Sequence, residues 1–165
     1  MKSYNILFLC TGNSARSILG EVIATSISNG KFVGYSAGST PNGVVNPFAV
    51  EIAKAYGYDL SKLRSKSWDE FSLPNAPHMD FIITVCDSAA GEACPYWPGK
   101  PASAHWGYPD PAAVVGSDEE KHAAFMAVEI GLRKRIEILM NLPLESLDHL
   151  AIHDALKEIG QTDRQ

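Results

Sequence analysis

The stretch YNILFLCTGNSARS, residues 4–17, decides the fold and is the most informative part of the sequence. Its apolar first half, residues 4–9, stops at the turn formers of residues 10–13, as a buried strand does at the edge of a sheet. From Ser14 onward, apolar residues recur at helical spacing until residues 29–30, Asn-Gly, give a stop signal. We therefore expect a strand, a glycine-containing turn and a helix in direct succession.

The rest of the chain continues this alternation of strands and helices. We expect further strands at residues 32–36, 81–85 and 102–105, helices at 47–56 and 118–141, and a weaker helix at 144–159. Continuous apolar strands that alternate with helices are typical of a parallel sheet covered by helices on both faces. The sequence thus predicts a three-layer α/β fold around a parallel four-stranded sheet.

Composition limits the size and the partners of the protein. A chain of 165 residues is one domain long, and we expect a catalytic domain at residues 1–142 with a helical tail of the same domain at 143–165. The net charge of -5 and the lack of a Lys/Arg run argue against nucleic acid as a partner. Because no apolar run reaches membrane-spanning length and only five residues precede the first apolar stretch, we expect a cytoplasmic protein without a membrane partner.

The turn at residues 10–17 places a cysteine and an arginine on either side of five residues. A loop between a strand end and a helix start directs successive backbone N–H groups at one point, and the helix dipole adds positive charge. Gly12 and Asn13 tolerate the positive φ that such a loop needs. The expected oxyanion-binding set is Thr11, Gly12, Asn13, Ser14, Ala15, Arg16 and Ser17.

Cys10 is the candidate nucleophile of this loop. Donors that stabilise a bound anion also stabilise a thiolate, so we expect the pKa of Cys10 to be lowered. Ser17 is placed to donate its hydroxyl to that thiolate. The alternative is a buried core cysteine that precedes an ordinary turn.

The run of Cys10, five residues, Arg16 and Ser17 near the N-terminus resembles the oxyanion loop of the low-molecular-weight tyrosine phosphatase superfamily. That superfamily also carries an Asp-Pro pair in a loop far downstream, and residues 110–111 have this pair before the last long helix. The resemblance covers most of the chain. It implies that Asp110 is the general acid, which protonates the departing oxygen in phosphoryl or arsenyl transfer.

Two branches of the superfamily compete as interpretations, phosphatases and thiol-linked arsenate reductases. Residues 84–95, TVCDSAAGEACP, look like the redox segment of the reductases, and residues 104–112 are similar to their acid loop. Phosphatases of this superfamily usually place aromatic residues just after the acid to stack on the substrate ring, whereas Ala112 and Ala113 follow here. These resemblances favour arsenate reduction.

The resemblance implies a disulfide relay without a tightly bound cofactor or metal. Cys10 attacks arsenate, Cys86 attacks the Cys10 sulfur and releases arsenite, and Cys94 then takes over the disulfide with Cys86. An external thiol reductant, thioredoxin or glutathione with glutaredoxin, completes the cycle. Open alternatives are a phosphatase in which Cys86 and Cys94 only protect Cys10, inert core cysteines, and a zinc site with His105.

A second expectation from the resemblance concerns a cation site behind the loop. Asn13, Glu21 and Ser36 match positions that bind potassium in some relatives, and Lys66 stands where those relatives have an aspartate. We hypothesise that the Lys66 ammonium takes the place of the cation and pairs with Glu21. The alternative is a solvated Lys66 near a turn.

Overall fold

The computed structural model describes residues 2–86, 97 and 99–161. It contains four strands, β1 (Tyr4–Cys10), β2 (Phe32–Gly38), β3 (Phe81–Thr84) and β4 (Ala102–His105). The α-helices are α1 (Arg16–Ile27), α2 (Pro47–Ala55), α4 (Asp118–Met140) and α5 (His149–Ile159). Short 3-10 helices are η1 (Leu60–Lys62), η2 (Trp68–Phe71), η3 (Pro111–Ala113) and η4 (Leu144–Ser146). No helix in the described ranges has the length and apolar character needed to cross a membrane.

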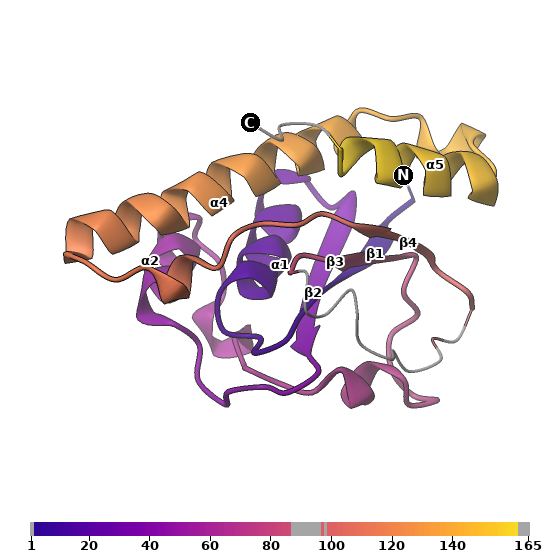
Figure 1. Cartoon of the computed structure of the whole chain (residues 1–165). Helices are drawn as coiled ribbons and strands as arrows, with labels where there is room; N and C mark the ends of the chain where they lie inside the picture. Colours follow the sequence, from indigo (N-terminus) through magenta and orange to yellow (C-terminus); the bar gives the residue numbers. More distant parts are fainter. Residues whose placement is uncertain (1, 87–96, 98, 162–165) are drawn as a thin grey trace.

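The strands form one parallel sheet in the order β2-β1-β3-β4, as predicted (Figure 1). The chain leaves β1 toward β2 on one side, and later returns to place β3 on the other side of β1. In open α/β sheets, ligands bind outside the carboxyl ends of the strands at such a reversal. Leu9 of β1 is in register with Thr84 of β3, so Cys10, the last residue of β1, and Cys86, two residues beyond β3, both lie at the carboxyl ends of the strands at this point.

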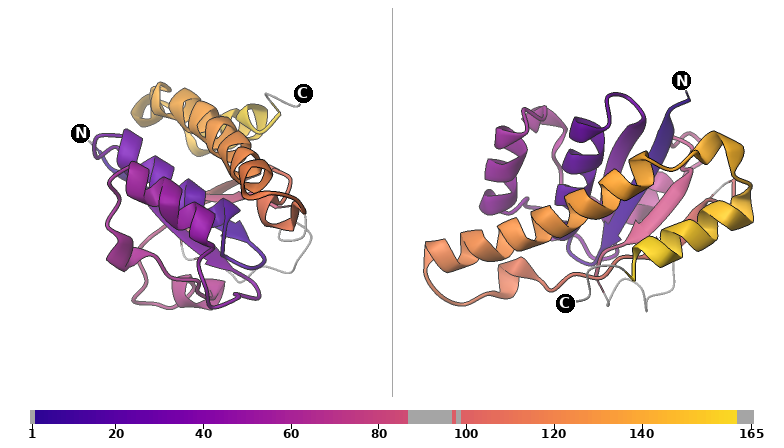
Figure 2. Two further views of the ribbon diagram at one scale, coloured as in Figure 1. Left: turned by 90° about the vertical axis from the view of Figure 1, so that its left-hand side faces the viewer. Right: turned by 90° about the horizontal axis from the view of Figure 1, so that it is seen from above.

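The two faces of the sheet are covered differently (Figure 2). The larger core packs α1, α4 and α5 on one face, around side chains such as Phe8, Leu132 and Leu156. On the other face, a smaller cluster packs Leu7 and Leu9 against Trp68 and Phe71 of η2. The three layers were predicted correctly, but the second face is covered, in the described part of the chain, by a 3-10 helix rather than by α-helices.

Helix boundaries follow local chemistry. Helix α1 begins at Arg16, two residues later than the sequence pattern indicates, because residues up to Ala15 belong to the loop. Helix α4 starts as predicted after Ser117, whose hydroxyl accepts from the N–H of Glu120 in a capping box. The start of α1 after β1 and the start of α4 after β4 are therefore each fixed by the loop before the helix.

Helix α5 docks on the edge of the sheet beside β4. Leu147 and Asp148 separate η4 from α5, so the single weaker helix predicted at 144–159 is in fact a short 3-10 helix and an α-helix. The indole N–H of Trp106 donates to the carbonyl of Leu156 over 2.9 Å, and both residues are fully buried. The last turn of α5 is thereby attached to the end of β4.

Candidate functional site

The loop from Cys10 to Ala15 is oriented by the segment that follows β2. The carbonyl groups of Thr11, Gly12 and Ser14 accept hydrogen bonds of 2.9 Å from the backbone N–H groups of Thr40, Asn42 and Asn46. In a planar trans peptide, the N–H of the next residue points opposite to the carbonyl. The N–H groups of Gly12, Asn13 and Ala15 therefore point inward. This geometry makes a cup of donors that suits a tetrahedral oxyanion.

Two glycines let the cup close. Asn13 has φ 46°, as predicted, whereas Gly12 does not have the positive φ predicted for it; a Cβ there would lie 3.0 Å from the side-chain amide of Asn42. Gly38 at the end of β2 is more constrained, since its Cβ would lie 2.4 Å from the Thr11 carbonyl oxygen. The sequence analysis missed Gly38 and residues 39–46. The cluster of turn formers at residues 39–43 is the signal that could have indicated them.

Ser17 donates to Cys10. Its Oγ lies 2.9 Å from the Cys10 Sγ, and Nδ2 of Asn13 lies 2.8 Å from the same Oγ. The backbone N–H of Lys66 donates to Oδ1 of Asn13 over 2.8 Å, which leaves the amide nitrogen to face Ser17. Because Asn13 already donates to the Ser17 oxygen, the contact favours the arrangement in which the hydroxyl hydrogen points at the sulfur. The N–H of Asn13 adds a second donor at 3.3 Å.

The pKa of Cys10 departs from the prediction. Its thiol is 3% exposed, and the hydrogen bond with Cys86 together with burial raises its pKa well above the usual value, although the hydrogen bonds from Ser17 act in the opposite direction. The expectation of a lowered pKa considered only the donors of the loop. It did not include a second thiol directed at the same place, which favours the protonated form of Cys10.

Arg16 and Asp110 meet at the mouth of the cup. Nη2 of Arg16 lies 3.8 Å from the Asp110 Oδ2, while Nη1 donates to the Tyr108 carbonyl over 2.9 Å. The other carboxylate oxygen of Asp110 accepts from the N–H of Ala112 and begins η3. With 44% of its side chain exposed, Asp110 is accessible to a substrate that sits on Arg16. The sequence analysis missed Tyr108, which no motif singled out.

Cys86 lies inside the same site. It is 2% exposed, and Thr11 Oγ1 lies 3.7 Å from its sulfur. Cys94 falls outside the described residues. His105 Nδ1 is 2.8 Å from the Thr84 hydroxyl, and no cluster of metal-ligating side chains occurs in the described part of the chain.

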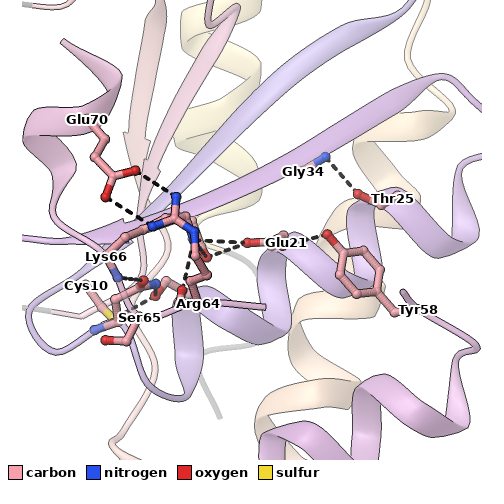
Figure 3. A network of polar contacts seen from close by, with 12 residues as sticks. Cys10, Glu21, Thr25, Gly34, Tyr58, Arg64, Ser65, Lys66 and Glu70 are labelled. Carbon is pink, nitrogen blue, oxygen red and sulfur yellow. Dashed lines mark hydrogen bonds and ion pairs between the residues drawn. The ribbon is translucent and has the colours of Figure 1, made fainter. Parts of the chain in front are cut away.

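A buried polar network lies behind the cup (Figure 3). The Lys66 ammonium is 3.7 Å from Glu21 Oε1, 3.4 Å from Ser36 Oγ and 3.0 Å from the Arg64 carbonyl oxygen. The hydroxyls of Ser36 and Tyr58 donate to the two oxygens of Glu21 over 2.6 and 2.5 Å. Burial lowers the pKa of Lys66, and Glu21 opposes this effect. Lys66 thus occupies the position expected for it, beside Glu21 and Ser36.

Comparison with known proteins agrees with this geometry. The sequence model of the family described as "Low molecular weight phosphotyrosine protein phosphatase" matches residues 5–149. The chain belongs to this family. Among curated family relatives, the arsenate reductase of Halalkalibacterium halodurans is 41% identical over 132 residues, which cover 80% of this chain and 91% of the relative. That of Bacillus subtilis is 42% identical over 135 residues, 81% of this chain and 94% of the relative.

Solved structures share the fold of this chain. An arsenate reductase in its phosphate-binding state is 25% identical, superposes with a TM-score of 0.61, and is matched over 83% of this chain and 96% of its own. A low molecular weight phosphotyrosine phosphatase from Vibrio cholerae shares the fold at 19% identity, with a TM-score of 0.63 over 88% of this chain and all of its own.

Proposed function

We propose that this chain is an arsenate reductase that uses Cys10, Cys86 and Cys94 in a disulfide relay. The observation that carries the proposal is the hydrogen bond between the buried thiols of Cys10 and Cys86 at the oxyanion cup. Hydrolysis of a phosphocysteine needs water but no second thiol. A thiol at this place is what reductive release of the intermediate requires. The curated reductases, which match over most of their length, add support.

The first step is nucleophilic. The Cys10 thiolate attacks arsenic, the cup and Arg16 bind the oxygens, and Asp110 gives its proton to the departing oxygen, which leaves as water. The product is a Cys10 sulfur–arsenic bond with arsenic still in its +5 state. Because the pKa of Cys10 is raised, its proton must pass to an oxygen of the arsenate dianion as that anion binds. The Ser17 hydroxyl then stabilises the sulfur anion at 2.9 Å.

The second step is reductive. The Cys86 thiolate attacks the Cys10 sulfur, a disulfide forms, and the sulfur–arsenic bond breaks with its electron pair on arsenic, which leaves as arsenite. Two sulfurs are oxidised by one electron each, and arsenic gains both electrons. Cys94 then attacks Cys86, which frees Cys10 and leaves a Cys86–Cys94 disulfide. A thioredoxin-type or glutaredoxin-type dithiol protein reduces that disulfide and closes the cycle.

Replacement of Cys86 by serine tests the proposal. Arsenate-dependent NADPH consumption, measured in parallel with the thioredoxin and the glutaredoxin systems, should disappear in Cys86→Ser. Hydrolysis of p-nitrophenyl phosphate should remain, because the cup, Arg16 and Asp110 are intact. Cys10→Ser is the control and should lose both activities. Multi-turnover arsenate reduction by Cys86→Ser would contradict the relay.

Hydrolysis of phosphomonoesters is the second candidate. The Asp110 side chain, exposed beside Arg16, is placed to protonate a leaving alcohol as well as a hydroxyl when its carboxyl group carries a proton. In that case Cys86 and Cys94 would only protect Cys10 by reversible oxidation. A phosphatase rate that far exceeds the arsenate rate of the wild-type protein, with both thiol systems present, would favour this alternative.

A further inference from the structure

Arg135 of α4 is a buried cation that the proposed reaction does not use. Arg135 is only 4% exposed, although arginine is seldom fully buried in proteins. The centre of its guanidinium lies 4.8 Å from the centroid of the Tyr108 ring, a cation–π contact. Its Nη2 also donates to the carbonyl of Gly160 over 3.2 Å. Arg135 thus joins the carboxyl end of α5 to Tyr108.

The Tyr108 ring is packed against α4 at a second point. A Cβ at Gly131, one turn before Arg135, would lie 2.9 Å from Cε1 of Tyr108. Glycine inside a helix costs about 1 kcal/mol relative to alanine, and here its small size makes room for the ring. The position of the ring is therefore set by Gly131 and Arg135 together.

The backbone of Tyr108 leads directly into the cup. Its N–H donates to the Val85 carbonyl, next to Cys86, and its carbonyl accepts from Arg16 Nη1 over 2.9 Å. Asp110 follows two residues later and contacts the same guanidinium. A shift of the Tyr108 ring would move the group that holds Arg16.

Helix α5 completes this connection from outside the matched part of the family. Apart from His149, it lies beyond residues 5–149, which the family model matches. Near the carboxyl end of a helix, carbonyl groups accept hydrogen bonds from donors and cations elsewhere in the protein. Here the Trp106 indole binds the Leu156 carbonyl and Arg135 binds that of Gly160.

We propose that Arg135 is a positioning residue for the oxyanion cup: it holds the Tyr108 carbonyl against Arg16, and the carboxyl end of α5 holds Arg135. The C-terminal helix thereby supports anion binding at a site to which it contributes no atom. The inference rests on the proposed function only in that both require the cup to bind a tetrahedral oxyanion.

Titration of the reduced full-length protein with inorganic phosphate in a calorimeter tests this role. Arg135→Lys keeps the charge but loses the planar stacking face and the fork, and should weaken phosphate binding about tenfold, or 1.4 kcal/mol. Tyr108→Leu should weaken phosphate binding by a similar factor. The variant that carries both substitutions should bind phosphate no more weakly than the single variant with the lower affinity. Gly131→Ala, which displaces the ring but leaves Arg135 in place, should also weaken binding.

Arg133→Lys is the matched control, since Arg133 lies on the same helix, is half-exposed and pairs with Glu129. It should bind phosphate as the wild type does. In steady state, Arg135→Lys should raise the KM for arsenate with little change in kcat. A purely structural role would lower the melting temperature and the active fraction, and hence kcat, at unchanged phosphate affinity.

Wild-type phosphate affinity in Arg135→Lys, or additive effects of Arg135→Lys and Tyr108→Leu, would overturn the inference and leave the proposed reductase intact. If Arg135→Lys does not fold, Tyr108→Leu and Gly131→Ala decide, and unchanged affinity in both would overturn it. A wild-type protein that binds neither phosphate nor arsenate would instead contradict the proposed function, and this inference with it.

Discussion

The Oγ of Ser17 lies 2.9 Å from the Sγ of Cys10, and Asn13 determines the direction of the hydrogen bond between them. Asn13 is itself fixed by the backbone of Lys66, which belongs to a different segment of the chain. A buried relay of three polar contacts thus connects the nucleophile to the network behind the cup. Its role in the chemistry of Cys10 can be measured directly.

Ser17→Ala should raise the pKa of Cys10 further. A hydrogen bond to a charged group contributes about 1.5–3 kcal/mol, so its loss should move the midpoint of Cys10 alkylation upward by at least about one pH unit. The rate of iodoacetamide labelling of the Cys10 peptide, followed by mass spectrometry against pH, gives this midpoint. Ser26→Ala, on the same helix, should leave it unchanged. A midpoint that stays or falls in Ser17→Ala would disprove the assigned donor.

Cys86→Ala should have the opposite effect on the same midpoint. The Cys86 contact is the main cause that raises the pKa of Cys10, since it favours the protonated thiol. Without it, the pKa of Cys10 should fall, and labelling at a pH below the wild-type midpoint should become faster. The same mass-spectrometric assay separates Cys10 from Cys94. Slower labelling of Cys10 in this variant would show that Cys86 stabilises the thiolate instead.

Potassium should not change the arsenate reductase rate of the wild-type protein. The buried Lys66 ammonium already lies beside Glu21 and Ser36, at the position where the family resemblance predicts a cation. Rates in potassium chloride and in tetramethylammonium chloride of equal ionic strength should therefore agree. A clear activation by potassium would refute this assignment of Lys66.

Lys66→Ala should lower the free energy of unfolding by about 3 kcal/mol, because Glu21 would remain buried without its cationic partner. Urea denaturation followed by tryptophan fluorescence measures this loss. Lys62→Ala removes an exposed lysine of η1 and should cost less than about 0.5 kcal/mol. Equal stability of the two variants would mean that the ammonium contributes nothing at Glu21.

Gly38→Ala should weaken phosphate binding, whereas Gly34→Ala should not. Both glycines lie on β2, and a Cβ at either would lie within 2.5 Å of a backbone oxygen, that of Thr11 for Gly38 and that of Glu21 for Gly34. Both variants should lower the melting temperature. Only the first displaces the cup, so calorimetry with phosphate should separate them. Equal phosphate affinity of the two would contradict the account of how the loop is held.

The fold was largely predictable because its signals are local. The apolar runs of β1 and β3, the turn at residues 10–13 and the Ser117 cap each carry their own sequence pattern. The mixed character of the tail was less predictable, since Pro143 and the charges of α5 dilute its helical period. Its docking depends on Trp106, a residue far away in the sequence.

The site was predictable only where a motif is continuous. Cys10, Arg16 and Ser17 lie within eight consecutive residues, and Asp110 is followed by a proline in a recognisable loop. Gly38, Tyr108 and Arg135 carry no motif, and their importance comes from atoms that the fold brings together. The predicted direction of the Cys10 pKa shift was wrong for the same reason, because the decisive neighbour, Cys86, comes from the segment after β3.

The outward-facing carbonyls of Thr11, Gly12 and Ser14 have a consequence for selectivity. Because the cup binds the anion largely through main-chain N–H groups, its affinity depends on the size, shape and charge of the anion. Arsenate and phosphate are nearly alike in all three properties. Phosphate should then compete for entry, and discrimination between the two oxoacids must arise after capture. Arsenic takes the electron pair of the sulfur–arsenic bond and leaves as arsenite, whereas phosphorus in the corresponding phosphocysteine is not readily reduced. The enzyme would therefore select its substrate by how easily the bound oxoacid is reduced, and not by how well it fits the cup.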